Sequence, residues 1–197
     1  MSLDPYDSGS GPPPNLYRYR EADSNWTEKK YGDNEMLAIW QTSELPADAN
    51  VTHVTLLPYR GEKAVVAYKN GRNALPEGDV APGEDLDAAI RRIASEQAGI
   101  LDCTPTHLGH MRCRATVYSK TEESGTITYR AVYGVDVGAI GDFPGDASFE
   151  RRILLQREMN TLVRDSYIEL RKEYTDALDR FLLDRLKANL RGDAVGS

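Results

Sequence analysis

The amino-acid sequence predicts an α+β fold, a mixed β-sheet sandwich with helices on its outside. Two observations support this class. Short segments rich in β-branched residues precede and follow one embedded helical segment, and a long helical pattern comes last in the chain. An order of strands, one helix, more strands and then helices is typical of an α+β domain.

Composition limits the classes of protein to which the chain can belong. Of its 197 residues, 40% are hydrophobic and 28% are charged, which is ordinary for a globular domain and favours neither a disordered nor a membrane class. The formal charge of −7 argues against general nucleic-acid binding, because an acidic surface repels a polyanion. With only two cysteines and no apolar leader behind a basic start, we expect a cytoplasmic protein with free thiols.

Changes in pattern along the chain predict its domain organisation. Residues 1–24 are rich in Pro, Gly, Ser and Asp and predict a flexible tail, and residues 193–197 predict another. Residues 25–162 carry the strand and helix patterns of one domain. Residues 163–192 continue as a helical extension. We therefore expect a single domain with an added C-terminal helix.

Strand patterns cover five segments of the domain, at residues 36–40, 51–57, 63–68, 109–118 and 126–137. Residues 58–62 separate the second and third as the turn of a hairpin. Ser124-Gly125 turns the fourth segment into the fifth. Residues 138–148, which are rich in glycine, predict a loop.

From Phe149 onward the apolar period becomes helical and continues to Leu190. Arg164-Asp165-Ser166 predicts a break between two helices, with Ser166 capping the second. The C-terminal stripe from Val163 to Leu190 would be roughly 40 Å long at 1.5 Å per residue, which is more than a small sheet can cover. We therefore expect part of it to meet a second copy of the chain in a two-fold homodimer.

The embedded helix lies in the segment LPEGDVAPGEDLDAAIRRIASEQAGI, residues 75–100. Glu84 and Asp85 place negative charge at its first turn, where it complements the helix dipole. An apolar stripe at helical spacing is formed by Leu86, Ile90, Ile93 and Ala94. Gly99 stands where a left-handed residue would end the helix. The pattern predicts a helix over residues 85–98.

The same segment resembles the signature of the Nudix hydrolase family. That signature is Gly, five residues, Glu, seven residues, Arg-Glu-apolar, one residue, Glu-Glu, one residue, Gly-apolar. Six positions agree in register over 23 residues, namely Gly78, Glu84, Arg92, Glu96, Gly99 and Ile100. The resemblance implies a Nudix fold and, by descent, a pyrophosphohydrolase that uses Mg²⁺ or Mn²⁺. It also implies that Glu84 pairs with Arg92 to hold the loop on the helix, while Gly78 and Gly99 serve backbone geometry.

Two departures fall on positions that bind the metal in that family. The residue after the arginine and the second of the paired glutamates are its main ligands, and here they are Ile93 and Gln97. Mg²⁺ requires hard oxygen ligands; isoleucine has none, and glutamine offers one neutral oxygen. Glu96 therefore remains as the catalytic and metal-binding carboxylate of the box. In the family the carbonyl at the position of Glu77 touches the metal, and the Glu77 carboxylate could add a ligand, although a solvated loop acid is the alternative.

Further candidates lie outside the box. Phosphate could be held by Arg72, Arg112 and Arg114, with plain surface charge as the alternative. The region of Glu150 and Glu158 is where the family often supplies an extra catalytic carboxylate. The spacing of Cys103, His107, His110 and Cys113 does not match that of structural zinc sites.

We therefore predict a Nudix-type protein that is impaired in metal-dependent hydrolysis, needs no cofactor, and acts by binding a nucleotide-type ligand or a partner. The alternative is an active pyrophosphohydrolase with Mg²⁺ or Mn²⁺, in which Glu96, Glu77 and a carboxylate from residues 150–158 rebuild the site. A regulator with a DNA-binding module is disfavoured, because the C-terminal region has too few residues for a winged helix.

Overall fold

The structure, a computed structural model, describes residues 26–143 and 148–191, so that the tails expected at residues 1–24 and 193–197 lie outside the described residues. Its strands are β1 (Thr27–Tyr31), β2 (Asn34–Gln41), β3 (Val51–Arg60), β4 (Lys63–Lys69), β5 (Arg72–Ala74), β6 (Glu77–Asp79), β7 (Ile100–Ala115), β8 (Ile127–Ile140) and β9 (Glu150–Leu154). Its helices are α2 (Leu86–Ala98), α3 (Gln156–Ser166), the 3₁₀ helix η1 (Ile168–Leu170) and α4 (Arg171–Arg191).

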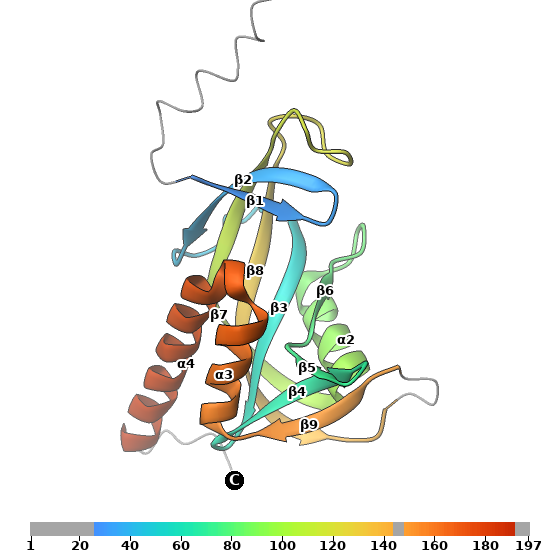
Figure 1. Cartoon of the computed structure of the whole chain (residues 1–197). Coiled ribbons are helices and arrows are strands. Elements are labelled where there is room, and N and C mark those ends of the chain that lie inside the picture. The colour runs from blue at the N-terminus through green and yellow to red at the C-terminus, as the bar shows by residue number, and fades with distance from the viewer. Residues whose placement is uncertain (1–25, 144–147, 192–197) are drawn as a thin grey trace, which may run out of the picture.

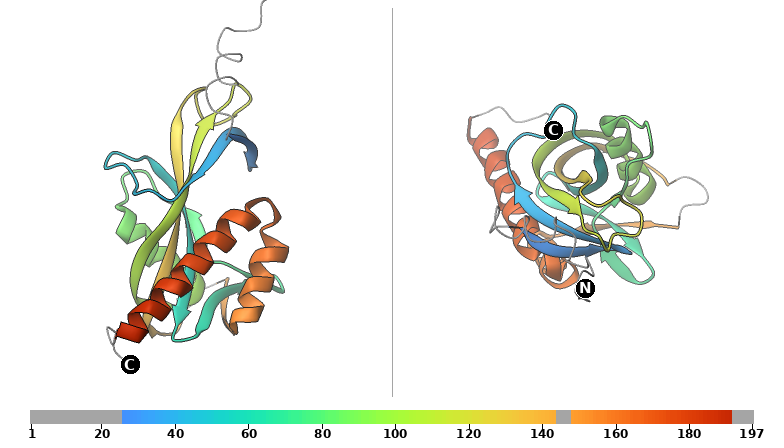
Figure 2. Two further views of the ribbon diagram at one scale, coloured as in Figure 1. Left: turned by 90° about the vertical axis from the view of Figure 1, so that its left-hand side faces the viewer. Right: turned by 90° about the horizontal axis from the view of Figure 1, so that it is seen from above.

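One mixed sheet forms the centre of the fold. Its strands follow the order β1-β2-β7-β8-β3-β4-β5, with β6 paired to β3 and β9 paired to β4. β3 and β8 run parallel, whereas β7 and β8 are antiparallel. The sheet curls strongly, and α2 and α4 lie on opposite sides of it (Figure 1; Figure 2). The predicted α+β class with a mixed sheet is confirmed.

Each face of the sheet has its own hydrophobic core. The core under α2 includes Val54, Leu56, Ile90, Ile93 and Ala94. The core under α3 and α4 includes Leu57, Tyr59, Met159, Tyr174 and Phe181. Neighbouring residues of β3 belong to different cores, because successive side chains of a strand point to opposite faces. β3 is therefore covered by helices on both faces.

The caps of α2 follow from its sequence. The Asp85 side chain accepts hydrogen bonds from the backbone N–H groups of Asp87 at 3.0 Å and Ala88 at 3.3 Å. At the other end Gly99 has a left-handed φ of 61°, which only glycine adopts without steric cost. Arg151 of β9 also donates to Gly141 O at 2.8 Å and reaches the carbonyl of Gly99 at 3.5 Å, where its charge complements the helix C-terminus.

Strand β7 begins at Ile100, directly after α2, and not at residue 109 as the pattern predicts. Its register shifts between Ile100 and Asp102 and again between His107 and Gly109. Such bulges interrupt the alternation of buried and exposed residues by which a strand is recognised in sequence. They explain why the first half of this long strand was not predicted.

The hairpin between β3 and β4 is tighter than predicted. β3 continues through Pro58 to Arg60, and the turn consists of Gly61 and Glu62 instead of residues 58–62. β4 pairs with β3 only at Tyr59 and Arg60, so no bond to β4 is lost at the proline.

Residues 149–155, predicted as helical, contain an edge strand. β9 pairs with β4 and buries only Leu154, so it lacks the two-residue alternation of a half-buried strand. β8 also extends to Ile140, into the loop predicted at residues 138–148, of which residues 144–147 lie outside the described residues. The break between the last helices falls at Tyr167, and Ser166 ends α3 and does not cap α4.

Helix α4 packs closely on β8 along its middle. A Cβ atom at Gly134 would overlap the ring of Phe181, so the helix approaches the strand as near as a glycine permits. Arg185 forms an ion pair with Asp136 of β8. Three leucines in the second half of α4 are 50%, 55% and 80% exposed, namely Leu183, Leu186 and Leu190. No helix in the described ranges is long and apolar enough to cross a membrane.

Candidate functional site

The loop that leads into α2 is held by one ion pair. Arg92 donates from Nε to Glu84 Oε1 at 2.7 Å and from Nη2 to Glu84 Oε2 at 2.8 Å, a bidentate arrangement. The same carboxylate accepts the N–H of Ala81 at 2.9 Å, and Arg92 Nη2 donates to Asp79 O at 3.0 Å. Hydrogen bonding from Arg92 lowers the pKa of Glu84 to about 2. The two residues are thus placed as the resemblance implies.

Ile93 is part of the hydrophobic core and is fully buried. A Cβ atom at Gly78 would lie 3.4 Å from Ile93 Cγ1, in ordinary van der Waals contact, so β6 packs directly on this side chain. At the position where the family places a metal-binding carboxylate, the structure therefore has hydrocarbon in contact with β6.

Gln97 binds the backbone of Glu77 with both ends of its side-chain amide. Gln97 Nε2 donates to Glu77 O at 2.6 Å, and Glu77 N donates to Gln97 Oε1 at 3.1 Å. The resemblance implies that a metal touches the carbonyl at this position. Here that carbonyl accepts a hydrogen bond from an amide, and the amide joins α2 to β6.

The two remaining carboxylates of the predicted metal site are not brought together. Glu96 is about half exposed and lies 3.6 Å from Arg92 Nη1. Glu77 Oε2 instead accepts a hydrogen bond from Thr55 Oγ1 at 3.3 Å, and this hydroxyl also contacts Tyr174 OH at 3.0 Å. Tyr174 belongs to α4, so the Glu77 side chain points to the sheet face opposite α2.

These contacts test whether the box residues fit a divalent ion. An octahedral Mg²⁺ site needs several oxygen ligands around one point. Ile93 supplies none, the amide of Gln97 directs a donor at the backbone carbonyl, and the Glu77 side chain faces the other way. Across residues 26–143 and 148–191, no three His, Cys, Asp or Glu side chains group in a way that could hold a metal. The residues do not fit the ion that the family uses.

The candidates outside the box lie apart from it. Arg72 is exposed on the edge strand β5. Arg112 and Arg114 share one face of β7, and their guanidinium carbons lie 5.3 and 5.0 Å from the ring centre of Trp26. Glu150 is paired with Arg152, at 3.4 Å.

Glu158 has a structural position at the start of α3. Its Oε2 accepts the N–H of Leu155 at 2.7 Å, which satisfies one of the free donors at this helix end.

The histidine and cysteine candidates form no common site. His107 Nε2 and His110 Nδ1 are 3.4 Å apart, and burial lowers the pKa of both rings, that of His110 to about 4. Cys103 and Cys113 are free and buried in different hydrophobic clusters.

Sequence reasoning did not single out a polar group on the face opposite α2. His53 Nδ1 lies 2.8 Å from Asp79 Oδ1, and His53 Nε2 is buried without a hydrogen-bond partner. Arg130 of β8 stacks over the ring of Tyr31, 4.2 Å from its centre. The two-residue alternation of β3 could have placed His53 and Thr55 on one face. The parallel pairing of β3 with β8, which adds Arg130, has no local signal.

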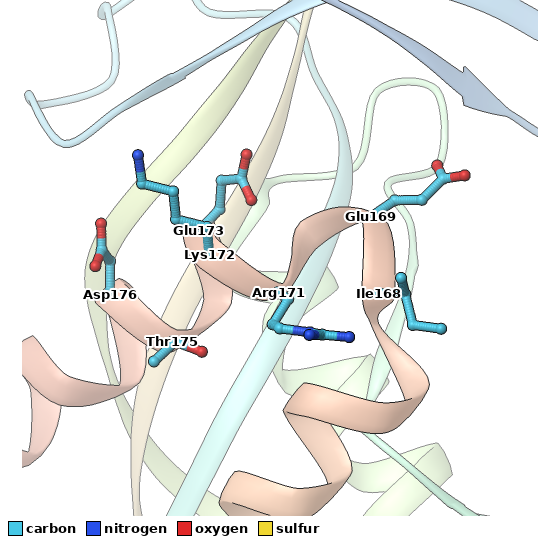
Figure 3. A pocket seen from close by; sticks show the side chains of 7 residues that line it. All are labelled: Ile168, Glu169, Arg171, Lys172, Glu173, Thr175 and Asp176. Carbon is cyan, nitrogen blue, oxygen red and sulfur yellow. The ribbon is translucent and has the colours of Figure 1, made fainter.

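A separate hollow of about 570 Å³ lies along η1 and the first turns of α4 (Figure 3). It is lined by Ile168, Glu169, Arg171, Lys172, Glu173, Thr175 and Asp176. Three acids and two bases alternate around it, so no single sign of charge favours an ionic ligand. None of the residues predicted from the sequence lines this hollow.

The structure is similar to solved structures of other proteins. The structure resembles that of a pyrophosphohydrolase from Bacillus subtilis with a TM-score of 0.54 and 16% identity, over 78% of this chain and 96% of that one. It also matches an ADP compounds hydrolase with a TM-score of 0.45 and 12% identity, over 84% of this chain and 96% of that one. No family model matches the sequence, and no curated protein does. The first likeness shows the Nudix fold, as the box predicts, and at this identity it shows the fold alone.

Proposed function

We propose that this chain is a Nudix-fold binding protein that is impaired in metal-dependent hydrolysis and recognises a nucleotide-type ligand. The observation that carries the proposal is the double hydrogen bond between the Gln97 amide and the backbone of Glu77. A cation and an N–H donor compete for the same carbonyl oxygen, because the positive end of the N–H dipole repels the cation. Because the donor is covalently held on α2, it competes at high effective concentration.

The neighbouring contacts support the same conclusion. Binding of an ion would require the Gln97 amide to leave Glu77, while the buried Ile93 offers no replacement ligand. The backbone N–H of Glu77 would then lose its partner in a partly buried place, which costs about 1–3 kcal/mol. The same two hydrogen bonds that keep an ion from Glu77 O therefore also hold α2 to β6.

A turnover and binding assay tests this proposal. The purified chain is incubated with ADP-ribose, nucleotide sugars and nucleoside triphosphates in Mg²⁺ or Mn²⁺, and binding of each is measured by calorimetry with and without EDTA. We expect no product above the buffer rate, and binding of at least one nucleotide that is unchanged by EDTA.

The rival function, an active pyrophosphohydrolase with a rebuilt carboxylate site, predicts the opposite outcome. Turnover that disappears with EDTA and in Glu96→Gln, but persists in the exposed control Glu62→Gln, would overturn the proposal. If none of the nucleotides binds, the proposal that the ligand is a nucleotide is wrong.

The proposal includes a homodimer and a reducing, cytoplasmic setting. Three outward leucines at the end of α4 support the first, because contiguous exposed apolar surface marks interaction sites. Two buried free thiols are compatible with the second. Light scattering during the nucleotide titration reports the mass of the particle. A monomer at all concentrations would contradict the dimer without affecting the ligand.

A further inference from the structure

The polar group opposite α2 is assembled by three adjacent strands. His53 of β3 lies opposite Asp79 of β6 and opposite Arg130 of β8 in the sheet register. Thr55 lies opposite Glu77 in the next row. Residues that are paired across strands have side chains on the same face, and in the antiparallel pairing of β3 with β6 their Cβ atoms lie about 5 Å apart. An acid, a histidine and an arginine therefore form one row, with a second acid beside it.

Two hydrogen-bond acceptors in this group face each other. With its proton on Nδ1, the His53 ring donates a hydrogen bond to the Asp79 carboxylate at 2.8 Å, and Nε2 then presents a lone pair as an acceptor. Nε2 has no hydrogen-bond partner, and it lies 3.8 Å from Glu77 Oε2, a second acceptor. The side chain of Glu77 is 38% exposed and that of Asp79 is 87% exposed, so this end of the row is open to a ligand.

The arginine in the row is held by a ring contact and not by an ion pair among the described residues. Arg130 is partly buried and stacks on Tyr31, but among the described residues it has no carboxylate at ion-pair distance and no hydrogen bond. Arg152 provides a comparison within the same chain. It stacks on Tyr68 at 4.1 Å in the same manner, yet it also pairs with Glu150 at 3.4 Å. The guanidinium of Arg130 retains five N–H donors suited to an oxyanion.

The surroundings hold these groups in place. Tyr174 OH contacts Thr55 Oγ1 at 3.0 Å, and Thr55 in turn donates to Glu77. Lys29 of β1 donates to the backbone carbonyl of Glu169 in η1, which ties the strand carrying Tyr31 to the helices. The negative charge of Glu77 also raises the pKa of Tyr174, in addition to the effect of burial. A group that is fixed from three sides is preorganised for a ligand.

We propose that this row binds a hydroxylated oxyanion, such as the sugar phosphate part of a nucleotide. Its hydroxyl groups would donate to His53 Nε2 and to Glu77, and its oxyanion would accept from Arg130. A carboxylate that accepts hydrogen bonds from sugar hydroxyls and an arginine that donates hydrogen bonds to phosphate oxygens are both common modes of recognition. The inference rests on the proposed nucleotide-binding function and assigns that binding to the sheet face opposite α2, where no metal is required.

Calorimetric titration of the full chain in EDTA tests the site. The probes are ribose 5-phosphate, ribose, inorganic phosphate and gluconate, so that a phosphate source is distinguished from a carboxylate source. We expect ribose 5-phosphate to bind at least ten-fold more tightly than phosphate or ribose. Tighter binding of gluconate would reassign the oxyanion to a carboxylate.

Matched variants locate the binding. Arg130→Met keeps an apolar contact with Tyr31 and should weaken binding of ribose 5-phosphate at least ten-fold, whereas Arg152→Met should leave it unchanged. Glu77→Gln should weaken it several-fold, because an amide is a poorer acceptor for two hydroxyls. Should Arg130→Met fail to fold, Arg130→Lys, which retains the charge but not the bidentate geometry, replaces it.

The site is refuted if the wild type binds no probe, or if Arg130 and Arg152 variants bind equally. Metal-dependent turnover, measured separately in Mg²⁺, refutes the loss of hydrolysis and leaves this site untouched. The two failures are therefore distinguishable.

Discussion

Strand β6 separates two regions that differ in how their polar groups are used. On the α2 side, Gly78 packs on Ile93, and the Gln97 amide satisfies the backbone of Glu77. On the opposite side, His53 and Arg130 retain hydrogen-bonding groups without partners among the described residues. The side that carries chemistry in the Nudix family is closed by packing and hydrogen bonds. The opposite side is the one that still has polar groups available.

Under the proposed function, two residues close the metal site. Ile93 is part of a core, and Gln97 makes an amide–carbonyl contact where the family has an ion–carbonyl contact, while the Glu84–Arg92 pair holds the loop. Buried polar groups in native proteins almost always have a hydrogen-bond partner. A buried polar group that lacks one within the protein is therefore a candidate for contact with a ligand.

The largest effect is expected from Ile93→Glu. It would place a carboxylate in a fully buried position without a partner, and we expect the free energy of unfolding to fall by about 3–5 kcal/mol. Urea unfolding measures the change, with Ile93→Leu as the control at less than about 1.5 kcal/mol. A stable Ile93→Glu protein that binds Mn²⁺ would show that the α2 side is still open to ions.

The next effect concerns pH and the histidine pair on the α2 side of the sheet. His110 stacks on His107 and makes an edge-to-face contact with Tyr129, and burial lowers its pKa from 6.5 to about 4. The unfolded chain therefore binds one more proton between these values, so stability is full above pH 6.5 and falls as the pH drops toward 4. The difference between the two pKa values corresponds to a loss of about 3 kcal/mol in the free energy of unfolding.

Unfolding curves between pH 7 and pH 4 measure this loss. We expect the slope of stability against pH to be reduced in His110→Asn, whatever the absolute stability of that variant. Equal slopes in the two proteins would show that this ring is not held neutral by the fold.

The smallest effect is expected from Gln97→Glu. The carboxylate lacks the N–H that binds Glu77 O, and two oxygens would then face each other, so we expect a loss of about 2 kcal/mol. Added Mn²⁺ should restore part of it, because an ion can bridge the two oxygens. Glu96→Gln, on an exposed side chain of the same helix, should change stability by less than about 0.5 kcal/mol. No loss in Gln97→Glu would mean that the amide is not what closes the site.

Local chemistry made part of this structure predictable. Asp85 and Gly99 mark the ends of α2 through their capping preferences, and the glycine and acid spacing of the box identifies the fold. Bulges in β7 and the single buried residue of β9 hide those strands, since neither leaves a regular alternation.

The candidate site was less predictable because side-chain direction depends on strand pairing. Glu77 and Gly78 are neighbours on β6 and must point to opposite faces, but that strand has only three residues and no pattern of its own. The approach of Arg130 to His53 depends on a parallel pairing between segments far apart in the chain. Residue types alone could identify Ile93 and Gln97 as departures, but not the partners that they bind.

The close approach of α4 at Gly134 has a consequence for how the sequence can vary. The ring of Phe181 fills the space that a side chain at position 134 would need. Even the methyl group of an alanine at this position would therefore push α4 away from β8. Tyr174, two turns earlier on the same face of α4, would move with it, and its hydroxyl would leave Thr55. Gly134 on β8 thus sets how closely α4 approaches the sheet, and with it the distance between the Tyr174 hydroxyl and Thr55.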